Sequence, residues 1–332
     1  MVVEPDKAFI MGGTWRIPVL LGLQPRNFIN DLKKDSTFNE ASFGREYESR
    51  WTGSVENAFF DGEKFDRNRI LLQPEYEFSG RSNKTAYYVL AVDVGRHQCQ
   101  TVITVIKVTP QPMGDAIKTI VNIFDLYDDH FEHQAITLKK LYYKYKARRI
   151  VIDANGIGTG LIDFMVKQQI DPSTGDILPD FGVYNDTEGE YKKFRTNICE
   201  FDAIYKIKAN APINTEAHTV LQLALNSGKV KFLVDERNAK NKLLGTKMGQ
   251  AMTPEQRNEY LKPYVLTSAL KEEMLNLREE NEGINIILKQ ANRSIPKDKF
   301  SSLEYGLYYI KEEEDAKRKK KRFRAADFMF MT

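Results

Sequence analysis

The chain has 332 residues, of which 42% are hydrophobic and 11% aromatic, which is enough for a buried core and too much for an intrinsically disordered chain. Its 49 basic and 46 acidic residues leave a net charge of +3, so an argument for nucleic-acid binding has to come from where the charges lie. Two cysteines without a CxxC pair give no thiolate zinc site, and no apolar run approaches the roughly 18 residues that span a membrane.

The first predicted elements form a three-stranded meander. Residues 1–75 are a lead-in without a core of its own, because they are irregular in period and rich in Phe, Asn, Gly and charge. An apolar run at 87–93 (YYVLAVD) predicts a strand that ends on an acid. The β-branched segment 101–108 predicts a second strand, and a third is predicted at 119–124 after the turn PQPMGD.

A helix, a strand and a second helix follow the meander. Residues 132–147 carry apolar side chains at helical spacing, residues 150–153 (IVID) predict a short buried strand, and NGIGTG leads into a helix at 161–168. The order β-β-β-α-β-α is typical of the ribonuclease H-like fold, an α/β fold with a mixed five-stranded sheet flanked by helices. We therefore expect strand 150–153 to lie beside strand 87–93.

The second half of the chain predicts insertions into this core and a C-terminal helix. The predicted elements are a strand at 182–184, helical stretches at 197–209 and 216–226, a strand at 229–234, a helix at 262–278, a strand at 283–288 and a last helix at 297–320.

Two acids end predicted strands of the core. Asp93 ends the first strand and Asp153 ends the strand expected beside it. Because adjacent strands lie about 4.8 Å apart, two carboxylates at their ends can share bound metal ions. Oxygen ligands of this kind suit Mg²⁺. The alternative is that each acid only caps a turn or a following helix.

A third acid is expected at the start of the last helix. Asp298 follows a proline in IPKDKFSSLEYGL, although acids are also favoured there by the helix dipole alone. Glu304 lies six residues later and, at about 100° per residue, points roughly 120° away from Asp298. We prefer Asp298, because Ser301 and Ser302 share its face and are small enough to leave room for a metal and a phosphate.

Three segments that carry these acids, VLAVDVG, RRIVIDANGIGTGLIDFM and SIPKDKFSSLEYGLYY, resemble the acid-bearing segments of phage terminase large-subunit nucleases. The segment FGREYESRWTG resembles the linker that joins the packaging ATPase to that nuclease. The resemblance implies that Asp93, Asp153 and Asp298 hold two Mg²⁺ or Mn²⁺ ions. It implies an endonuclease that cuts concatemeric double-stranded viral DNA during genome packaging by two-metal phosphodiester hydrolysis.

The resemblance also sets expectations for domains, partners and location. Residues 76–332 are expected to be the nuclease domain, and residues 1–75 a linker or remnant of the motor half. The expected partners are double-stranded DNA, the packaging ATPase half, the portal and the small terminase subunit, with no membrane. The place of action is the cytoplasm of the infected host, since the N-terminus MVVEPDKAFI lacks a secretion signal. The phosphate-binding motif GxxxxGK[ST] is missing, so this chain alone is not expected to hydrolyse ATP.

Clustered basic residues are the candidates for DNA contact, because non-specific binding depends on contacts to backbone phosphates. The candidates are Lys192, Lys193, Arg195, Lys240, Lys242, Lys247, Lys317, Arg318, Lys319, Lys320, Lys321 and Arg322. A solvated surface is the alternative for each cluster, and the acidic stretch 312–315 is an alternative partner for the C-terminal one.

Other patterns carry less. The run DLYDDHFEHQ (125–134) and His97 are interpreted as surface turns, and His218 is assigned no role. The glycines of GIGTG (156–160) are interpreted as a sharp turn that leaves the Asp153 carboxylate open, rather than as a phosphate loop. Three alternative functions remain: a Holliday-junction-resolvase-like nuclease, an actin- or sugar-kinase-like ATP-binding protein, and a docking module without catalysis.

Overall fold

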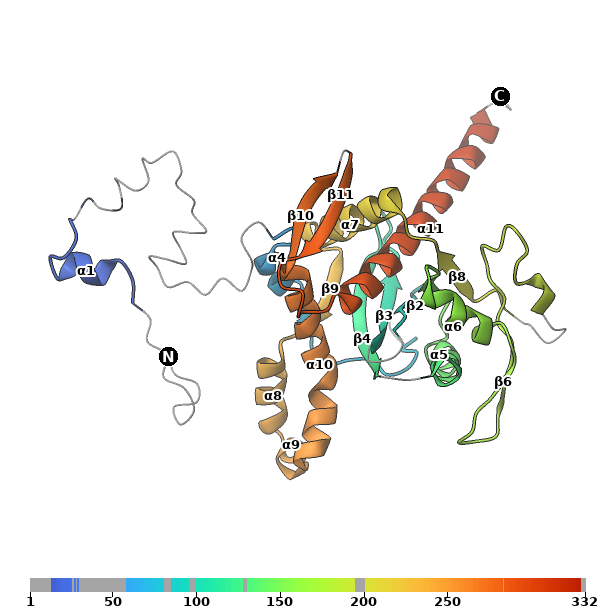
Figure 1. Cartoon of the computed structure of the whole chain (residues 1–332), viewed down its shortest axis with the longest axis horizontal. Helices are drawn as coiled ribbons and strands as arrows, with labels where there is room; N and C mark the ends of the chain where they lie inside the picture. The colour runs from blue at the N-terminus through green and yellow to red at the C-terminus, as the bar shows by residue number, and fades with distance from the viewer. Residues whose placement is uncertain are drawn as a thin grey trace. The chain divides into compact units, whose positions relative to one another are not determined.

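The computed structural model describes residues 13–25, 27, 29, 58–80, 85–95, 100–127, 130–194, 201–282 and 284–329, the side chains of 281–282 and 320–329 excepted. The chain divides into two units, Met1–Ala58 and Phe59–Thr332 (Figure 1). In the first unit the structure describes one short helix, α1 (Arg16–Leu20). Everything below concerns the second unit.

The second unit alternates strands and helices. In chain order its elements are α4 (Gly62–Arg67), β1 (Arg69–Leu71), β2 (Tyr87–Asp93), β3 (Gln100–Thr109), β4 (Ile117–Tyr127), α5 (Phe131–Tyr145), β5 (Arg149–Asp153), α6 (Ile157–Met165), β6 (Gln169–Ile170), β7 (Ile177–Leu178), the 3₁₀ turn η1 (Lys192–Phe194), β8 (Ile204–Ile207), α7 (Ala211–Asn226), β9 (Val230–Leu233), α8 (Glu236–Leu244), α9 (Lys247–Ala251), α10 (Pro254–Leu275), β10 (Leu277–Glu282), β11 (Asn285–Gln290) and α11 (Asp298–Met329).

The main sheet has the ribonuclease H-like order. Its strands lie in the sequence β1-β9-β4-β3-β2-β5-β8. The pairs β2–β3 and β3–β4 are antiparallel, whereas β5 pairs in parallel with β2, and β8 with β5. The predicted meander and the predicted neighbour of its first strand are therefore confirmed. The sheet has seven strands rather than five, because β9 and then β1 extend it in parallel beyond β4, and β8 extends it beyond β5.

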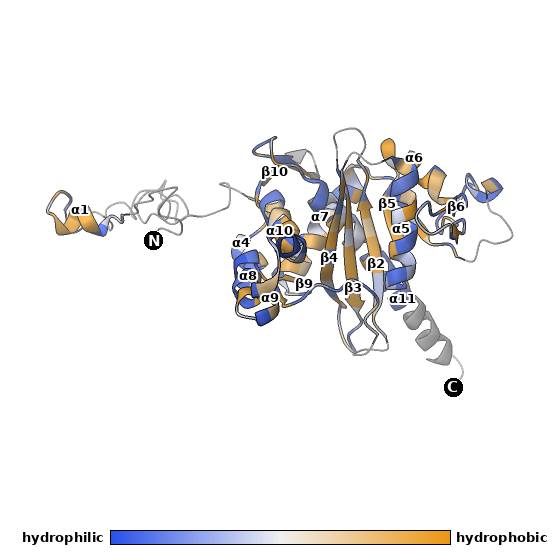
Figure 2. Cartoon of the chain, turned by 90° about the horizontal axis from the view of Figure 1, so that it is seen from below, coloured by the Kyte–Doolittle hydropathy of each residue, from blue (hydrophilic) through white to orange (hydrophobic). Residues whose placement is uncertain are grey.

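Helices cover both faces of the sheet and so bury strands that are apolar on both sides (Figure 2). Alternation along β2 separates two clusters of buried side chains. Val89 and Ala91 belong to the cluster that includes apolar residues of α7, α10 and α11. Tyr88 and Leu90 belong to the cluster that includes apolar residues of α5 and α6. Each face of the sheet is thus identified by the helices that pack on it.

Three expectations from the sequence need correction. The helix predicted at 197–209 is wrong where the structure describes it, because β8 occupies part of that span and pairs there with β5. The folded unit starts at Phe59 rather than at residue 76, because β1 joins the sheet. The helix predicted at 262–278 begins earlier, at Pro254, where Thr253 and Gln256 form a capping box.

Candidate active site

The two strand-end acids lie on the same face of the sheet. Asp93 is the last residue of β2 and Asp153 the last of β5, and the residues just before them, Val92 and Ile152, are register partners. Alternation places Asp93 on the face of Ala91, and Asp153 on the face of Val151. Both of those residues pack in the cluster that includes α11. The carboxylates therefore lie at neighbouring strand ends, on the face that α11 covers.

The turn after Asp153 is built for a close approach of backbone to backbone. A Cβ atom on Gly158 would lie 1.7 Å from the carbonyl oxygen of Asp153, and Gly156 has a φ of +60°. The backbone N–H of Asn155 donates to Asp153 Oδ1 at 3.0 Å. The glycines thus let the chain turn sharply into α6, while one hydrogen bond orients the carboxylate.

Helix α11 begins at the same end of the sheet with Asp298. Its first turn is held from α10 by buried Glu273, which accepts from the Phe300 N–H at 3.0 Å and from Lys299 Nζ at 3.1 Å. Four residues after Asp298, the fully buried Ser302 donates to the Ala91 carbonyl oxygen at 2.9 Å. The expected space for a metal beside Ser302 is therefore not there, and its small side chain instead brings the helix close to the sheet.

Burial and mutual repulsion act on Asp93. The pKa of Asp93 is raised from 3.8 to about 8, first by burial and then by the negative charges of Asp298 and Asp153. The nearby ammonium of Lys297 acts in the opposite direction, and Glu304 adds a further negative charge. Burial also raises the pKa of Asp153, against the hydrogen bond from Asn155. The three predicted acids are thus close enough for their charges to interact at Asp93.

A buried ion pair lies behind these acids. Glu304 and His218, on α11 and α7, have side chains that are 4% and 8% exposed, and His218 Nδ1 lies 2.6 Å from Glu304 Oε2. Burial raises the pKa of Glu304, and His218 opposes that rise. Sequence reasoning missed this pair, because a single histidine in a helix and a glutamate 86 residues away form no motif.

The donor chemistry of the three aspartates fits a hard divalent cation, since all donors are carboxylate oxygens. Within the described ranges, no three His, Cys, Asp or Glu side chains are gathered tightly enough to hold a metal ion as they stand. Three carboxylates that repel one another draw together only when a cation joins them, so binding would require their side chains to rotate.

The basic candidates differ in their surroundings. Lys192 and Lys193 lie on η1, Lys240 and Lys242 on α8, and Lys247 opens α9. Arg195 lies outside the described residues, as do the side chains of Lys320, Lys321 and Arg322, which continue α11.

The described basic residues near the C-terminus contact acids of this chain. Lys317 Nζ lies 3.2 Å from Glu313, and Arg318 pairs with Asp115 on the β3–β4 hairpin. The acidic stretch 312–315 pairs partly with the sheet, because Glu314 contacts Lys118 Nζ at 3.0 Å. Lys319 remains exposed.

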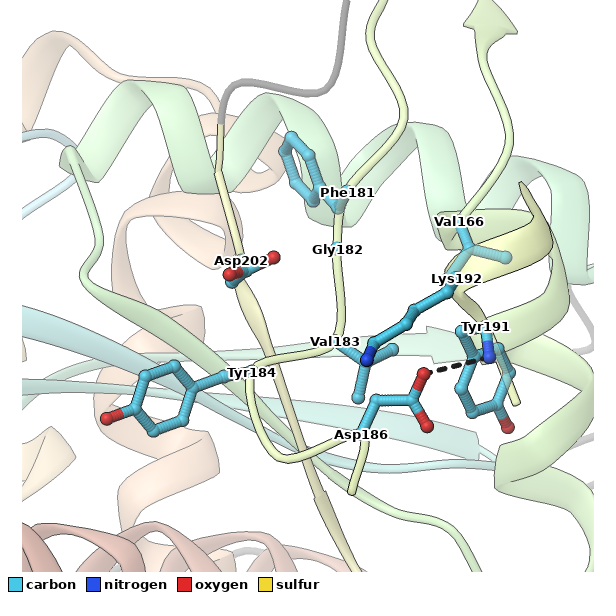
Figure 3. A pocket seen from close by; sticks show the side chains of 9 residues that line it. All are labelled: Val166, Phe181, Gly182, Val183, Tyr184, Asp186, Tyr191, Lys192 and Asp202. Carbon is cyan, nitrogen blue, oxygen red and sulfur yellow. Dashed lines mark hydrogen bonds between the residues drawn. The ribbon is translucent and has the colours of Figure 1, made fainter. Parts of the chain in front are cut away.

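Lys192 also lines a cavity of about 270 Å³ (Figure 3). The walls include Tyr184 and Asp202, and Asp186 accepts there from the Tyr191 N–H at 2.9 Å. None of the three aspartates lines it, so this cavity is separate from the candidate active site.

The weaker patterns of the sequence are only partly described. His97, Asp128 and Asp129 lie outside the described residues. Asp125 lies 2.8 Å from Lys262 Nζ of α10. Among the described residues, no helix is long and apolar enough to cross a membrane.

The sequence matches no protein-family model and no curated protein. Among solved structures, the chain is similar to the magnesium-bound large terminase nuclease from thermophilic phage G20c, with 14% identity and a TM-score of 0.43 over 76% of this chain and 97% of that one. It is similar to the large terminase nuclease domain of Thermus phage P74-26, with 14% identity and a TM-score of 0.39 over 75% and 94% of the two chains. It is also similar to the HK97 bacteriophage large terminase, with 7% identity and a TM-score of 0.41 over 89% of this chain and 49% of that one.

Proposed function

We propose that this chain is a divalent-metal-dependent endonuclease that cuts double-stranded DNA. The observation that carries the proposal is the placement of Asp93 and Asp153 at the ends of paired parallel strands, on the face covered by α11. Asp298 at the start of that helix is the third acid, and its charge acts on Asp93.

Each acid has a distinct part in the proposed reaction. Asp93, between the other two in its electrostatics, would be shared by two ions of Mg²⁺ or Mn²⁺, with Asp153 and Asp298 as the further ligands. When bound, such ions supply a water of lowered pKa and stabilise the leaving oxygen of a phosphodiester. Asn155 orients the Asp153 carboxylate through its N–H, and Glu273 holds the helix turn that presents Asp298.

The biological setting is a second part of the proposal. The three acid-bearing segments resemble those of phage terminase nucleases, which supports a role in cutting concatemeric viral DNA during packaging. A packaging ATPase, the portal and the small terminase subunit would then be the partners, in the cytoplasm of the infected host.

The proposal is tested by incubating the purified chain with supercoiled plasmid and Mn²⁺ or Mg²⁺. We expect nicking or cutting that is lost in EDTA and in Asp93→Asn and Asp153→Asn, because each substitution removes a ligand charge. Asp163→Asn on the exposed side of α6 is the matched control and should cut normally. Cleavage that persists in EDTA, or that survives Asp93→Asn, would refute the proposal.

A further inference from the structure

The interface between α7 and α11 is polar where it passes the candidate active site. Tyr305 Oη donates to Asn214 Oδ1 at 3.2 Å, and one turn further along α7 His218 contacts Glu304. Elsewhere these helices pack with apolar side chains, including Leu221 and Leu303. Burying an ion pair costs desolvation energy, and apolar residues of similar size would pack these helices as well or better. Packing alone therefore gives no reason for the His218–Glu304 pair.

The pair is oriented with its negative end toward the acids. Glu304 is one of the charges that raise the pKa of Asp93, and the charge of Asp153 acts in turn on Glu304. His218 acts on Glu304, whereas the charges that act most on Asp93 are those of other acids and of Lys297. The imidazole also lies beside the Phe300 ring, with 5.9 Å between ring centroids, which limits how far it can turn.

We propose that His218 and Glu304 form an electrostatic positioning pair that sets how tightly the three aspartates bind a divalent cation. Glu304 supplies a fixed negative charge near the cation without being one of its ligands. His218 holds that carboxylate in place and balances its charge, so that the fold tolerates it. The inference rests on the proposed function, because it needs a cation at the aspartates.

The test is the affinity for Mn²⁺ alone, measured by isothermal titration calorimetry on the full chain in a buffer above pH 8. Glu304→Gln keeps the shape and removes the negative charge, so the dissociation constant should rise by about fivefold. His218→Gln keeps a hydrogen-bond donor and leaves Glu304 unbalanced, so the dissociation constant should fall by a factor of about three. The double variant should lie between the two single variants.

A purely structural role predicts a different pattern. Both single variants would then loosen α11 and weaken Mn²⁺ binding together, and that result would overturn the inference. If His218→Gln does not fold, the inference is decided by Glu304→Gln, for which an unchanged affinity would refute it.

Two controls separate this inference from the proposed function. Glu314→Gln removes a buried charge from the same helix, ten residues or about 15 Å further along, and should leave Mn²⁺ affinity unchanged. Asp93→Asn should abolish Mn²⁺ binding. If Asp93→Asn binds Mn²⁺ like the unaltered chain, the proposed function fails. If Asp93→Asn does not bind and the Glu304 and His218 variants match the unaltered chain, only this inference fails.

Discussion

Asp298 and Glu304 lie on the same helix, close to the same acids, but in different environments. Asp298 is partly exposed at the helix start, whereas Glu304 is buried against His218. We expect Asp298→Asn to lose plasmid cleavage by at least about 100-fold, as expected for a missing metal ligand. Glu304→Gln should keep substantial activity once Mn²⁺ is saturating. Circular dichroism confirms that both variants fold, and an active Asp298→Asn beside an inactive Glu304→Gln would reverse the assignment.

Asp93 also gives a prediction for stability against pH. Because its pKa is raised from 3.8 to about 8, the folded chain keeps a proton there that the unfolded chain releases. Stability of the metal-free protein therefore falls as pH rises through this window. Asp93→Asn removes the effect, and should melt a few degrees higher than the unaltered chain at pH 8, at about 2–4 °C per kcal/mol relieved. In thermal melting with EDTA present, the difference should shrink toward pH 5, and a constant difference would contradict the prediction.

At the scale of elements, the core was predictable where a local pattern and a turn agree. The runs that became β2, β3 and β5 are apolar and bounded by turns, so both the strands and the acids that end them could be read from the sequence. The strand β8 could not, because four residues in a segment with helical spacing become a strand only through pairing with β5.

Long-range interactions explain what the site prediction lacked. The pairing of Glu304 with His218, and the burial of Ser302 under the sheet backbone, depend on how α7 and α11 cross the sheet. Neither leaves a trace in local spacing. The acids were identifiable because each belongs to an element end, whereas the residues that position them belong to helix faces.

The junction of β5 and α6 allows a prediction about an element that positions an acid. In Gly158→Ala, the new Cβ would lie 1.7 Å from the Asp153 carbonyl oxygen, so the strand end or the helix has to move. We expect a decrease of at least about 1–3 kcal/mol in stability and of at least tenfold in cleavage. Gly114→Ala is the control, because its φ of +81° makes alanine strained there too, but at the far end of the sheet. It should lose stability and keep activity per folded molecule, and equal activity losses in both variants would contradict the assignment.

At the scale of the whole folded unit, α11 connects two ends with different chemistry. From Asp298 to Lys317 the helix rises about 28 Å, at 1.5 Å per residue. Along that path it is fixed at the acid end by Glu273 and at the other end by Glu314, which accepts from the Ala116 N–H at 2.8 Å. The C-terminal basic block therefore starts at the end of the sheet opposite the candidate active site.

That separation predicts how the basic block contributes to DNA binding. A distance of about 28 Å corresponds to about 8 base pairs of duplex, so DNA at the aspartates reaches the block only if it is longer than this. Deleting residues 319–332 spares Lys317 and Arg318, which pair with acids of this chain. The truncated chain should bind a duplex of about 30 base pairs more weakly, and the slope of log K against log salt should fall by about 0.9 for each phosphate that the block neutralises. Binding to a duplex of about 10 base pairs and the Mn²⁺ dependence of cleavage should hardly change. Fluorescence anisotropy of both duplexes in EDTA measures this, and equal weakening on the two, or an unchanged salt slope, would show that the block does not extend the DNA-binding surface in this way.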